Sequence, residues 1–287
     1  MNSSISVIIP AYNEAGAIAS TIAAARRILA DGGVSHEIWV VDDGSSDGTG
    51  RIAESCGAAV IAHPENLGYG AALKTGILRS QYEWIAILDA DGSYPVEELP
   101  RLLREIPAFD MVVGARTGAY YEGSMGKHVS RKIFQWLVEF VTGRRIPDIN
   151  SGMRIFRRDI AARHFRMISN GFSFTTTLTL AMMLEYHFVK YVPIAYHQRI
   201  GKSHVHHLWD TLRAGQIIAQ AILHYNPIKF FLLLMLASCA SSLVGMGLAV
   251  FAGLHPALLI GWGGMQAALL LFGMGGLAYV VRSSSPD

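Results

Sequence analysis

The 287-residue sequence predicts an α/β protein: a mostly parallel sheet with helices on both faces, followed by a C-terminal two-helix transmembrane hairpin. Two observations lead to this fold class, and a third concerns the location of the N-terminal domain. Short, fully apolar runs alternate with helical periods over the first 115 residues. Residues 230–281 include no charged side chain, although charged residues make up 16% of the chain. The N-terminus lacks a basic region followed by an apolar run, so we expect the N-terminal domain to stay in the cytoplasm.

Five apolar runs have the length of buried strands, and helical periods separate them. This alternation is typical of a doubly wound sheet, in which ligands bind beyond the carboxyl ends of the strands. The predicted strands are 6–10, 37–41, 58–62, 84–88 and 111–114, and the predicted helices are 14–29, 48–55, 69–79 and 95–106.

Residues 230–254 and 257–281 are two uncharged spans, each longer than the ~20 residues that cross a bilayer. Only two residues separate them, which predicts a tight hairpin. Lys229 before the pair and Arg282 after it place both ends on the cytoplasmic side of the cell (inner) membrane by the positive-inside rule. The expected parts are a cytoplasmic domain (1–204), an interfacial amphipathic linker (205–229), the two spans and a cytoplasmic tail (282–287).

Small residues recur at every fourth position of the first span. A face of small residues permits close helix contact. The contact is expected either within the hairpin or between subunits, so a homo-oligomer is one expectation. The positions are Ala237, Ser241, Gly245, Ala249 and Gly253.

Composition excludes two classes of protein. The charges nearly balance, with 24 Lys+Arg against 22 Asp+Glu, so the total shows no nucleic-acid footprint. Cys56 falls in a predicted soluble helix and Cys239 in an apolar span, which excludes a disulfide framework and fits a reducing cytoplasm.

Acidic residues follow three of the predicted strands. The first strand runs into PAYNE (10–14), the second into DDGSSDGT (42–49) and the fourth into Asp89-Ala-Asp91-Gly. In a parallel sheet these ends meet at one edge. Two carboxylates two residues apart repel each other unless a cation neutralises them. Asp89 and Asp91 therefore predict a divalent ion with oxygen ligands, Mg²⁺ or Mn²⁺, whereas Asp47 is expected to be a helix cap.

Other motif matches fail on context. Gly44–Gly48 matches the nucleophile-elbow pattern, but two acidic residues stand directly before it. Residues 68–73 form only a partial dinucleotide fingerprint and do not follow the first strand. A histidine cluster near residue 200 is best explained as a loop facing lipid headgroups, with His204 kept as a candidate contact to the metal or donor.

Seven segments together carry a family resemblance. They are PAYNE, DDGSSDGT, residues 66–74, the DAD followed by Gly92 and Pro95, and the segments 114–116, 148–154 and 199–203. The combination resembles family 2 glycosyltransferases, which have the GT-A (Rossmann-like) fold. Within that family it is most similar to dolichyl-phosphate mannosyltransferase and bacterial polyprenyl-phosphate (undecaprenyl-phosphate) glycosyltransferases. The likeness covers about residues 4 to 230, and the following two spans match the bacterial two-helix members.

The resemblance implies inverting, metal-dependent transfer of one hexose, such as glucose or mannose, from a UDP- or GDP-sugar to a polyprenyl phosphate. It implies a nucleotide site of Pro10, Tyr12, Glu14, Asp42, Asp43, Lys74, Asp89 and Ala90. The implied metal contacts are Asp89, Asp91 and Ser93, and the implied lipid-phosphate groups are Arg116, Arg131, Arg154, Arg199 and Lys202. Catalysis would rest on Asp89, Asp91, Arg116 and Lys202. Ser93 departs from the family, since the dolichyl-phosphate enzymes commonly carry Gln at this place.

The chemistry of the acceptor explains the absence of an obvious acid/base pair. A phosphate monoester has a second pKa near ~6, so it is largely an anionic nucleophile at cytoplasmic pH. Catalysis then rests on positioning and charge, with a metal for the departing diphosphate and guanidinium groups for the acceptor phosphate.

Three alternative functions have weaker support. A processive polysaccharide synthase would carry a Gln-x-x-Arg-Trp signature and many spans. A nucleotidyltransferase would place a glycine-rich Arg/Lys segment near the first strand, where this chain has PAYNE. A non-catalytic nucleotide-sugar-sensing membrane protein would have lost an Asp of the DAD or the basic cluster, and both are intact.

Overall fold

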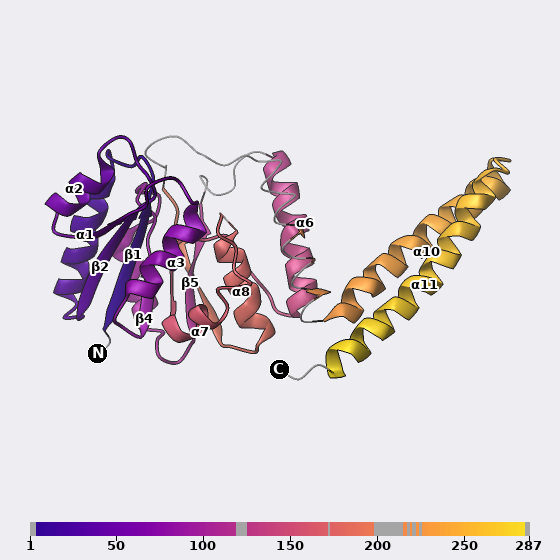
Figure 1. Ribbon diagram of the computed structural model, residues 1–287. Coiled ribbons are helices and arrows are strands. Elements are labelled where there is room, and N and C mark those ends of the chain that lie inside the picture. The colour runs from indigo at the N-terminus through magenta and orange to yellow at the C-terminus, as the bar shows by residue number, and fades with distance from the viewer. Residues whose placement is uncertain are drawn as a thin grey trace. The chain divides into compact units, whose positions relative to one another are not determined.

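The computed structural model describes residues 4–118, 125–171, 173–197, 215–216, 219, 222–223 and 226–284. The chain divides into two compact units, Met1–Gly215 and Gln216–Asp287, which are described separately below. Figure 1 shows the strands and most of the helices in the first unit and a pair of long helices in the second.

A seven-stranded sheet forms the centre of the first unit, in the order β3-β2-β1-β4-β6-β5-β7 (Figure 1). Its strands are β1 (Ile5–Ala11), β2 (His36–Asp42), β3 (Ala59–Ala62), β4 (Trp84–Ile87), β5 (Met111–Thr117), β6 (Arg154–Arg157) and β7 (Val189–Ala195). Only β6 runs antiparallel to its neighbours, β4 and β5. The other pairs are parallel, so β1, β2, β4 and β5 all end at one edge of the sheet. The predicted mostly parallel sheet is confirmed.

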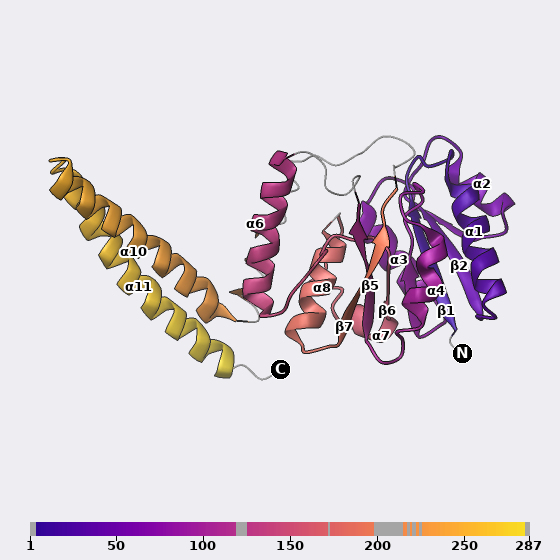
Figure 2. The ribbon, with the colours of Figure 1, turned by 180° about the vertical axis from the view of Figure 1, so that it is seen from behind.

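Helices cover both faces of the sheet, as predicted (Figures 1 and 2). One core lies under α1 (Ile18–Asp31), α2 (Thr49–Ser55) and α4 (Leu99–Leu103), which follows the short 3₁₀ helix η1 (Val96–Glu98). The other core lies under α3 (Tyr69–Arg79), α7 (Arg158–Arg163) and α8 (Phe174–Leu184). Successive strand residues alternate between the two, since Val7 and Ile9 belong to the first core and Ile8 to the second.

Helix α6 (Met125–Thr142) packs against α8. Val138 and Val141 are buried, whereas Trp136 is exposed and its ring stacks on Phe140 at 5.9 Å. The helix thus has one core-facing side and one exposed aromatic side.

The second unit contains α10 (Pro227–Phe251) and α11 (Ala257–Ser284), both long and apolar enough to cross a membrane. The two helices lie side by side along their length (Figures 1 and 2). Small and hydroxyl residues form the contact. Ser238 Oγ donates to the Gly264 carbonyl at 2.8 Å and Ser242 Oγ donates to the Gly261 carbonyl. A Cβ added at Gly245 would lie 2.8 Å from the Gly261 nitrogen.

The predicted small-residue stripe is only partly the packing face of the hairpin. Gly245 and Ala249 are buried there, but Ala237, Ser241 and Gly253 are exposed. The contact follows Ser238 and Ser242 instead, because serine hydroxyls that donate to carbonyls of the opposite helix permit the same close approach as glycine.

Candidate functional site

The loops that follow β1 and β2 are tied together at the carboxyl edge of the sheet. Asn13 has a left-handed backbone, with φ 56°. Its N–H donates to Ser45 Oγ at 2.9 Å, and its side-chain oxygen accepts from the Ser46 N–H at 2.9 Å. The Glu14 N–H donates to Thr49 Oγ1 at 2.9 Å. These bonds hold the PAYNE segment in a turn, and for this reason α1 begins at Ile18 rather than at the predicted residue 14.

Asp47 belongs to this framework. Its carboxylate accepts from the Thr49 N–H and from the Ala15 N–H, each at 3.0 Å. Burial raises the pKa of Asp47, but the hydrogen bonds from Thr49 and Ala15 outweigh this effect, and the pKa lies below its ordinary value. The residue joins the start of α2 to the turn after β1. The N-cap of α2 is Gly48 rather than Asp47, so the expected capping role is met only by the bond from the Thr49 N–H.

The two adjacent aspartates after β2 differ in their surroundings. Asp42 accepts from the Ser45 N–H at 2.9 Å and lies beside the half-buried Tyr12–Glu14 turn through the β1–β2 register. Asp43 is 3% exposed, and both of its oxygens accept from the protein: His63 Nδ1 at 2.7 Å, the Leu67 N–H at 3.0 Å and the Gly68 N–H at 2.8 Å. Asp43 therefore fixes the loop that leads into α3.

The acidic pair follows β4 directly. Tyr69, the first residue of α3, donates its hydroxyl to Asp89 Oδ1 at 2.9 Å. Ser93 donates its N–H (3.0 Å) and its hydroxyl (2.6 Å) to Asp91 Oδ1. Asp89 is half-buried, Asp91 is 7% exposed, and Ser93 is fully buried. Two carboxylates oriented by hydroxyl donors fit a hard divalent ion with oxygen ligands.

Gly152 lies against Asp89. A Cβ at this position would collide with the Asp89 carboxylate, whose Cγ would be 2.8 Å away. The Gly152 N–H donates to Tyr94 Oη at 2.7 Å. Burial raises the pKa of the Tyr94 hydroxyl, the nearby Arg116 lowers it, and Asp89 raises it further. Gly152 thus contacts Asp89 and bonds to Tyr94, whose hydroxyl lies near Arg116.

Arg116 lies near the end of β5 and forms a bidentate ion pair with Asp148. Its Nε is 2.7 Å from Oδ2 and its Nη2 is 2.9 Å from Oδ1. The guanidinium also lies over the Tyr196 ring at 5.3 Å, and Tyr196 contacts Tyr94 edge-to-face at 5.3 Å. The Arg116 side chain is 17% exposed and that of Asp148 is 2% exposed. Asp148 thus holds a partly exposed guanidinium at the edge where the acidic pair lies.

Arg154 requires a correction. It was expected near the lipid phosphate, but it is fully buried at the start of β6. Its guanidinium donates to the Ser151 and Thr175 carbonyls and to Thr179 Oγ1, each at 3.0 Å, and to the Ile149 carbonyl at 3.3 Å. Burial lowers the pKa of Arg154 because the charged form loses hydration. A side chain enclosed in this way cannot receive a lipid phosphate.

Lys74, expected in the nucleotide site, is also bonded to the protein. An ammonium has three donors, and Lys74 Nζ uses three on the protein: the Phe165 carbonyl at 2.8 Å, the Ile168 carbonyl at 2.5 Å and Asn170 Oδ1 at 2.7 Å. Burial lowers its pKa. The residue anchors the loop after α7 to α3, and its contact with a nucleotide stays a prediction.

The remaining predicted residues are placed only in part. Pro10 pairs with Val41 in the β1–β2 register, and Ala90 is buried between Asp89 and Asp91. The Arg131 side chain, Arg199, Lys202 and His204 lie outside the described residues. His197, the last described residue before this segment, lies at the site, because its N–H donates to the Ser93 carbonyl at 2.9 Å.

Tyr69, Tyr94, Asp148 and Gly152 were not predicted as site residues. Tyr69 and Asp148 belong to segments that carry the family resemblance, which is the only sequence signal for them. Their partners, Asp89 and Arg116, are 20 and 32 positions away along the chain. The order of the strands in the sheet brings these residues together, and a local pattern in a single sequence does not predict the contacts.

Comparisons with known proteins give a consistent result. The family model described as glycosyl transferase family 2 matches residues 6–165. The low-salt glycan biosynthesis hexosyltransferase Agl6 of Haloferax volcanii is 32% identical over 94% of this chain, which spans only 62% of that relative. A dolichyl-phosphate hexose transferase of Haloferax volcanii is 31% identical over 76% of this chain and 92% of its own length. An undecaprenyl-phosphate mannosyltransferase of Micrococcus luteus is 30% identical over 76% of this chain and 90% of its own.

Solved structures agree on the fold. Glucosyl-3-phosphoglycerate synthase from Mycobacterium tuberculosis, in complex with Mn²⁺, UDP and phosphoglyceric acid, superposes with a TM-score of 0.60. The match covers 77% of this chain and 78% of that one at 21% sequence identity. At this identity the likeness concerns the fold alone.

Proposed function

Because this chain belongs to glycosyl transferase family 2, we propose that it transfers a single hexose from a UDP- or GDP-sugar to a polyprenyl phosphate, with inversion and with a divalent metal ion. One observation carries the proposal. The acidic pair after β4 and the Arg116–Asp148 pair at the end of β5 meet at one sheet edge, where Gly152 lies against Asp89 and bonds to Tyr94. A cation site for a diphosphate would thus lie beside a guanidinium suited to a second phosphate.

The donor half of the site would consist of the turns after β1 and β2. Pro10, Tyr12, Glu14 and Asp42 would line the nucleotide pocket, while Asp43 keeps the adjacent loop in place through its bonds to His63, Leu67 and Gly68. A Mg²⁺ or Mn²⁺ ion held by Asp89 and Asp91 would neutralise charge on the departing nucleoside diphosphate. The Ser93 hydroxyl bonds to Asp91, so we assign it to the orientation of that carboxylate.

The acceptor half would use basic residues. Arg116 is already oriented by Asp148, so little side-chain entropy remains to be lost when a phosphate binds. Arg131, Arg199 and Lys202 complete the proposed set, and residues 198–214 follow directly from the contact of His197 with Ser93. A phosphate monoester with a pKa near ~6 needs no general base, so positioning by these cations supplies its reactivity.

The two long apolar helices support a membrane location. Lys229, near the start of α10, and Arg282, near the end of α11, bound the uncharged stretch 230–281. We propose that both ends and the catalytic unit face the cytoplasm. The names of the relatives from Haloferax volcanii and Micrococcus luteus agree with a lipid-phosphate acceptor.

The test is a transfer assay with the full-length protein purified in detergent. Labelled UDP- and GDP-hexoses are supplied with polyprenyl phosphate and with Mg²⁺, Mn²⁺ or chelator. We expect metal-dependent label in the organic phase from one donor, and a loss of at least about 100-fold in Asp91→Ala, equivalent to ~2.7 kcal/mol. The exposed-site variant Asp31→Asn should keep full activity.

Two results would contradict the proposal. Label in a water-soluble polymer would indicate a processive synthase. Metal-dependent nucleotide binding without transfer from any donor would favour the sensing function.

A further inference from the structure

A second group of potential metal ligands lies at the other edge of the sheet. His164 directly follows α7, Glu185 directly follows α8, and His187 stands two residues before β7. Because β5 and β7 are parallel, the amino end of β7 lies beside that of β5, whereas Asp89 and Arg116 are at carboxyl ends. This group and the proposed transferase site therefore lie at opposite ends of the strands.

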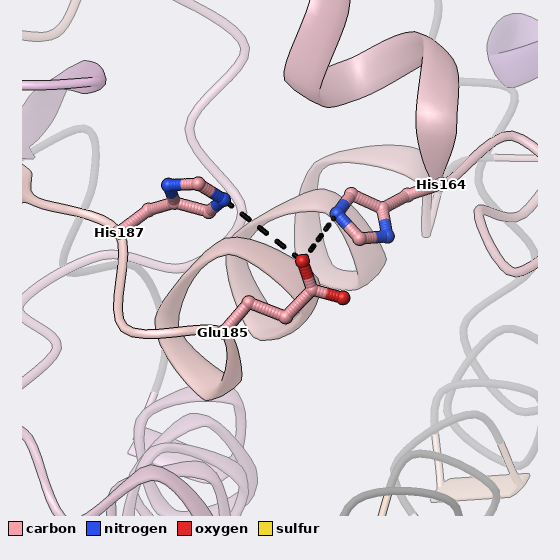
Figure 3. Close-up of side chains that lie close together, drawn as sticks. All are labelled: His164, Glu185 and His187. Atoms are coloured by element: carbon pink, nitrogen blue, oxygen red, sulfur yellow. Dashed lines mark ion pairs between the residues drawn. The ribbon is translucent and has the colours of Figure 1, made fainter. Parts of the chain in front are cut away.

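The three side chains converge on one carboxylate oxygen (Figure 3). Glu185 Oε2 is 3.1 Å from His164 Nε2 and 3.9 Å from His187 Nε2. The three candidate ligand atoms all lie within 4.8 Å of one another. Ligands at ~2.0–2.2 Å in tetrahedral geometry around Zn²⁺ lie roughly 3.4 Å apart. Small side-chain adjustments are enough to bring the three atoms into one coordination sphere.

His164 provides an independent observation. Its side chain is 7% exposed, and within the described residues its buried Nε2 atom has no hydrogen-bond partner. Its near charged neighbour is the Glu185 carboxylate, whose Oε2 lies 3.1 Å away. A buried imidazole nitrogen costs free energy unless a well-formed hydrogen bond or a cation satisfies it. A cation between the nitrogen and the carboxylate would bind both.

The surroundings of His187 resemble the support of a metal-bound histidine. Its Nδ1 is 3.5 Å from Asp110 Oδ2, on the ring side away from Glu185. Asp110 Oδ2 itself accepts from the Phe188 N–H at 2.9 Å. The His187 carbonyl accepts from Arg144 at 2.9 Å. A carboxylate behind a ligating histidine fixes its tautomer and ring orientation.

From these contacts we propose that His164, Glu185 and His187 bind one Zn²⁺ ion, with water in a fourth position. Two imidazoles and one carboxylate suit Zn²⁺ better than Mg²⁺, which prefers oxygen ligands. Glu185 and His187 are 39% and 22% exposed, so the ion has a path from solvent.

The consequence would be structural. The ion would join the ends of α7 and α8 to the residue before β7, and so close the segment between His164 and Glu185. The loop within that segment supports α3, since the Asn170 carbonyl accepts from the Ala71 N–H at 2.9 Å and Asn170 Oδ1 accepts from Lys74. Tyr69, which donates to Asp89, is at the start of the same helix. Zinc would thus stabilise the support of the transferase site without contacting a substrate.

The test is Zn²⁺ binding by the full-length protein in detergent, after chelator treatment and in excess Mg²⁺. Competition with a chromophoric chelator gives stoichiometry and affinity. We expect one Zn²⁺ per chain, a higher unfolding temperature with Zn²⁺, and loss of this site in His187→Ala and in Glu185→Gln. Asp110→Asn should weaken binding by roughly 10-fold, as outer-shell changes do.

Control variants separate this site from other ligands. His204→Ala and Asp91→Ala should still bind one Zn²⁺ per chain, because neither residue is a proposed zinc ligand. His204 belongs to the segment 198–214 and Asp91 to the acidic pair. His187→Ala is preferred to a change at the buried His164, which can disturb folding by itself. The proposal would be overturned if the wild type did not bind stoichiometric Zn²⁺. It would also be overturned if His187→Ala and Glu185→Gln bound Zn²⁺ as well as the wild type does. Neither result depends on the transfer assay.

Discussion

Two arginines from segments that carry the family resemblance have different surroundings. Arg116, near the end of β5, is partly exposed and paired with one carboxylate, Asp148. Arg154, at the start of β6, is fully buried and bonded to carbonyl and hydroxyl oxygens. The segment 148–154 links them, because it supplies Asp148 to the first and contains the second. Arginine is thus a candidate phosphate ligand at position 116 and an internal support at position 154. The difference in burial separates the two roles.

The largest expected effect is that of Arg154→Met on stability. The substitution removes the donors to four buried oxygen groups, each of which costs roughly 1–3 kcal/mol when left unpaired. We expect a loss of about 3–5 kcal/mol in the free energy of unfolding, seen as a much lower unfolding temperature. Wild-type stability combined with a raised KM for polyprenyl phosphate would instead place Arg154 in the acceptor site.

Gly152→Ala tests how the segment 148–154 supports the acidic pair. The new Cβ would collide with the Asp89 carboxylate, so the acidic pair must move. We expect kcat/KM for transfer to fall about 100-fold, or ~2.7 kcal/mol, with a higher Mg²⁺ or Mn²⁺ requirement. Gly16→Ala is the matched control, because nothing lies within 4 Å of its added Cβ. Equal activity of the two variants would separate residue 152 from the metal site.

Arg116→Ala should affect the acceptor more than the fold. We expect a decrease of roughly 30-fold in kcat/KM, or ~2 kcal/mol, carried mainly by KM for the lipid phosphate. Because the single change leaves the buried Asp148 carboxylate without its guanidinium, the double variant Arg116→Ala/Asp148→Asn is needed. It should recover stability without recovering activity. Recovery of both would show that Arg116 is a second internal support like Arg154.

Tyr69→Phe is expected to have the smallest effect. The hydroxyl orients Asp89, and the loss of such an outer-shell donor typically weakens metal affinity about 10-fold. Burial and the charge of Asp89 raise the pKa of Tyr69 well above its ordinary value, so the hydroxyl stays protonated and donating through neutral and mildly alkaline pH. The metal dependence of transfer, measured in both proteins, should shift to higher concentration in the variant. An unchanged dependence would show that Asp89 needs no such support.

Much of the first half of the fold follows from local pattern. The five predicted strands correspond to β1–β5 because apolar runs bounded by helical periods have few other stable arrangements. β6 and β7 do not follow the pattern: the first has an arginine at each end, and the second contains Lys190 and Pro193. Their place in the sheet comes from pairing with β4 and β5, which are far away along the chain.

The sequence by itself determined the acidic pair after β4, the family and the two apolar spans, because each depends on residue types at short spacing. Only the tertiary structure decided which charged side chains remain accessible. Lys74 and Arg154 are basic residues in the expected segments, yet their donors are used by carbonyl and side-chain oxygens of the loops they hold. The physical reason is that hydrogen-bond partners and burial are set by segments tens to nearly a hundred residues apart, as between Lys74 and Asn170, which are 96 positions apart.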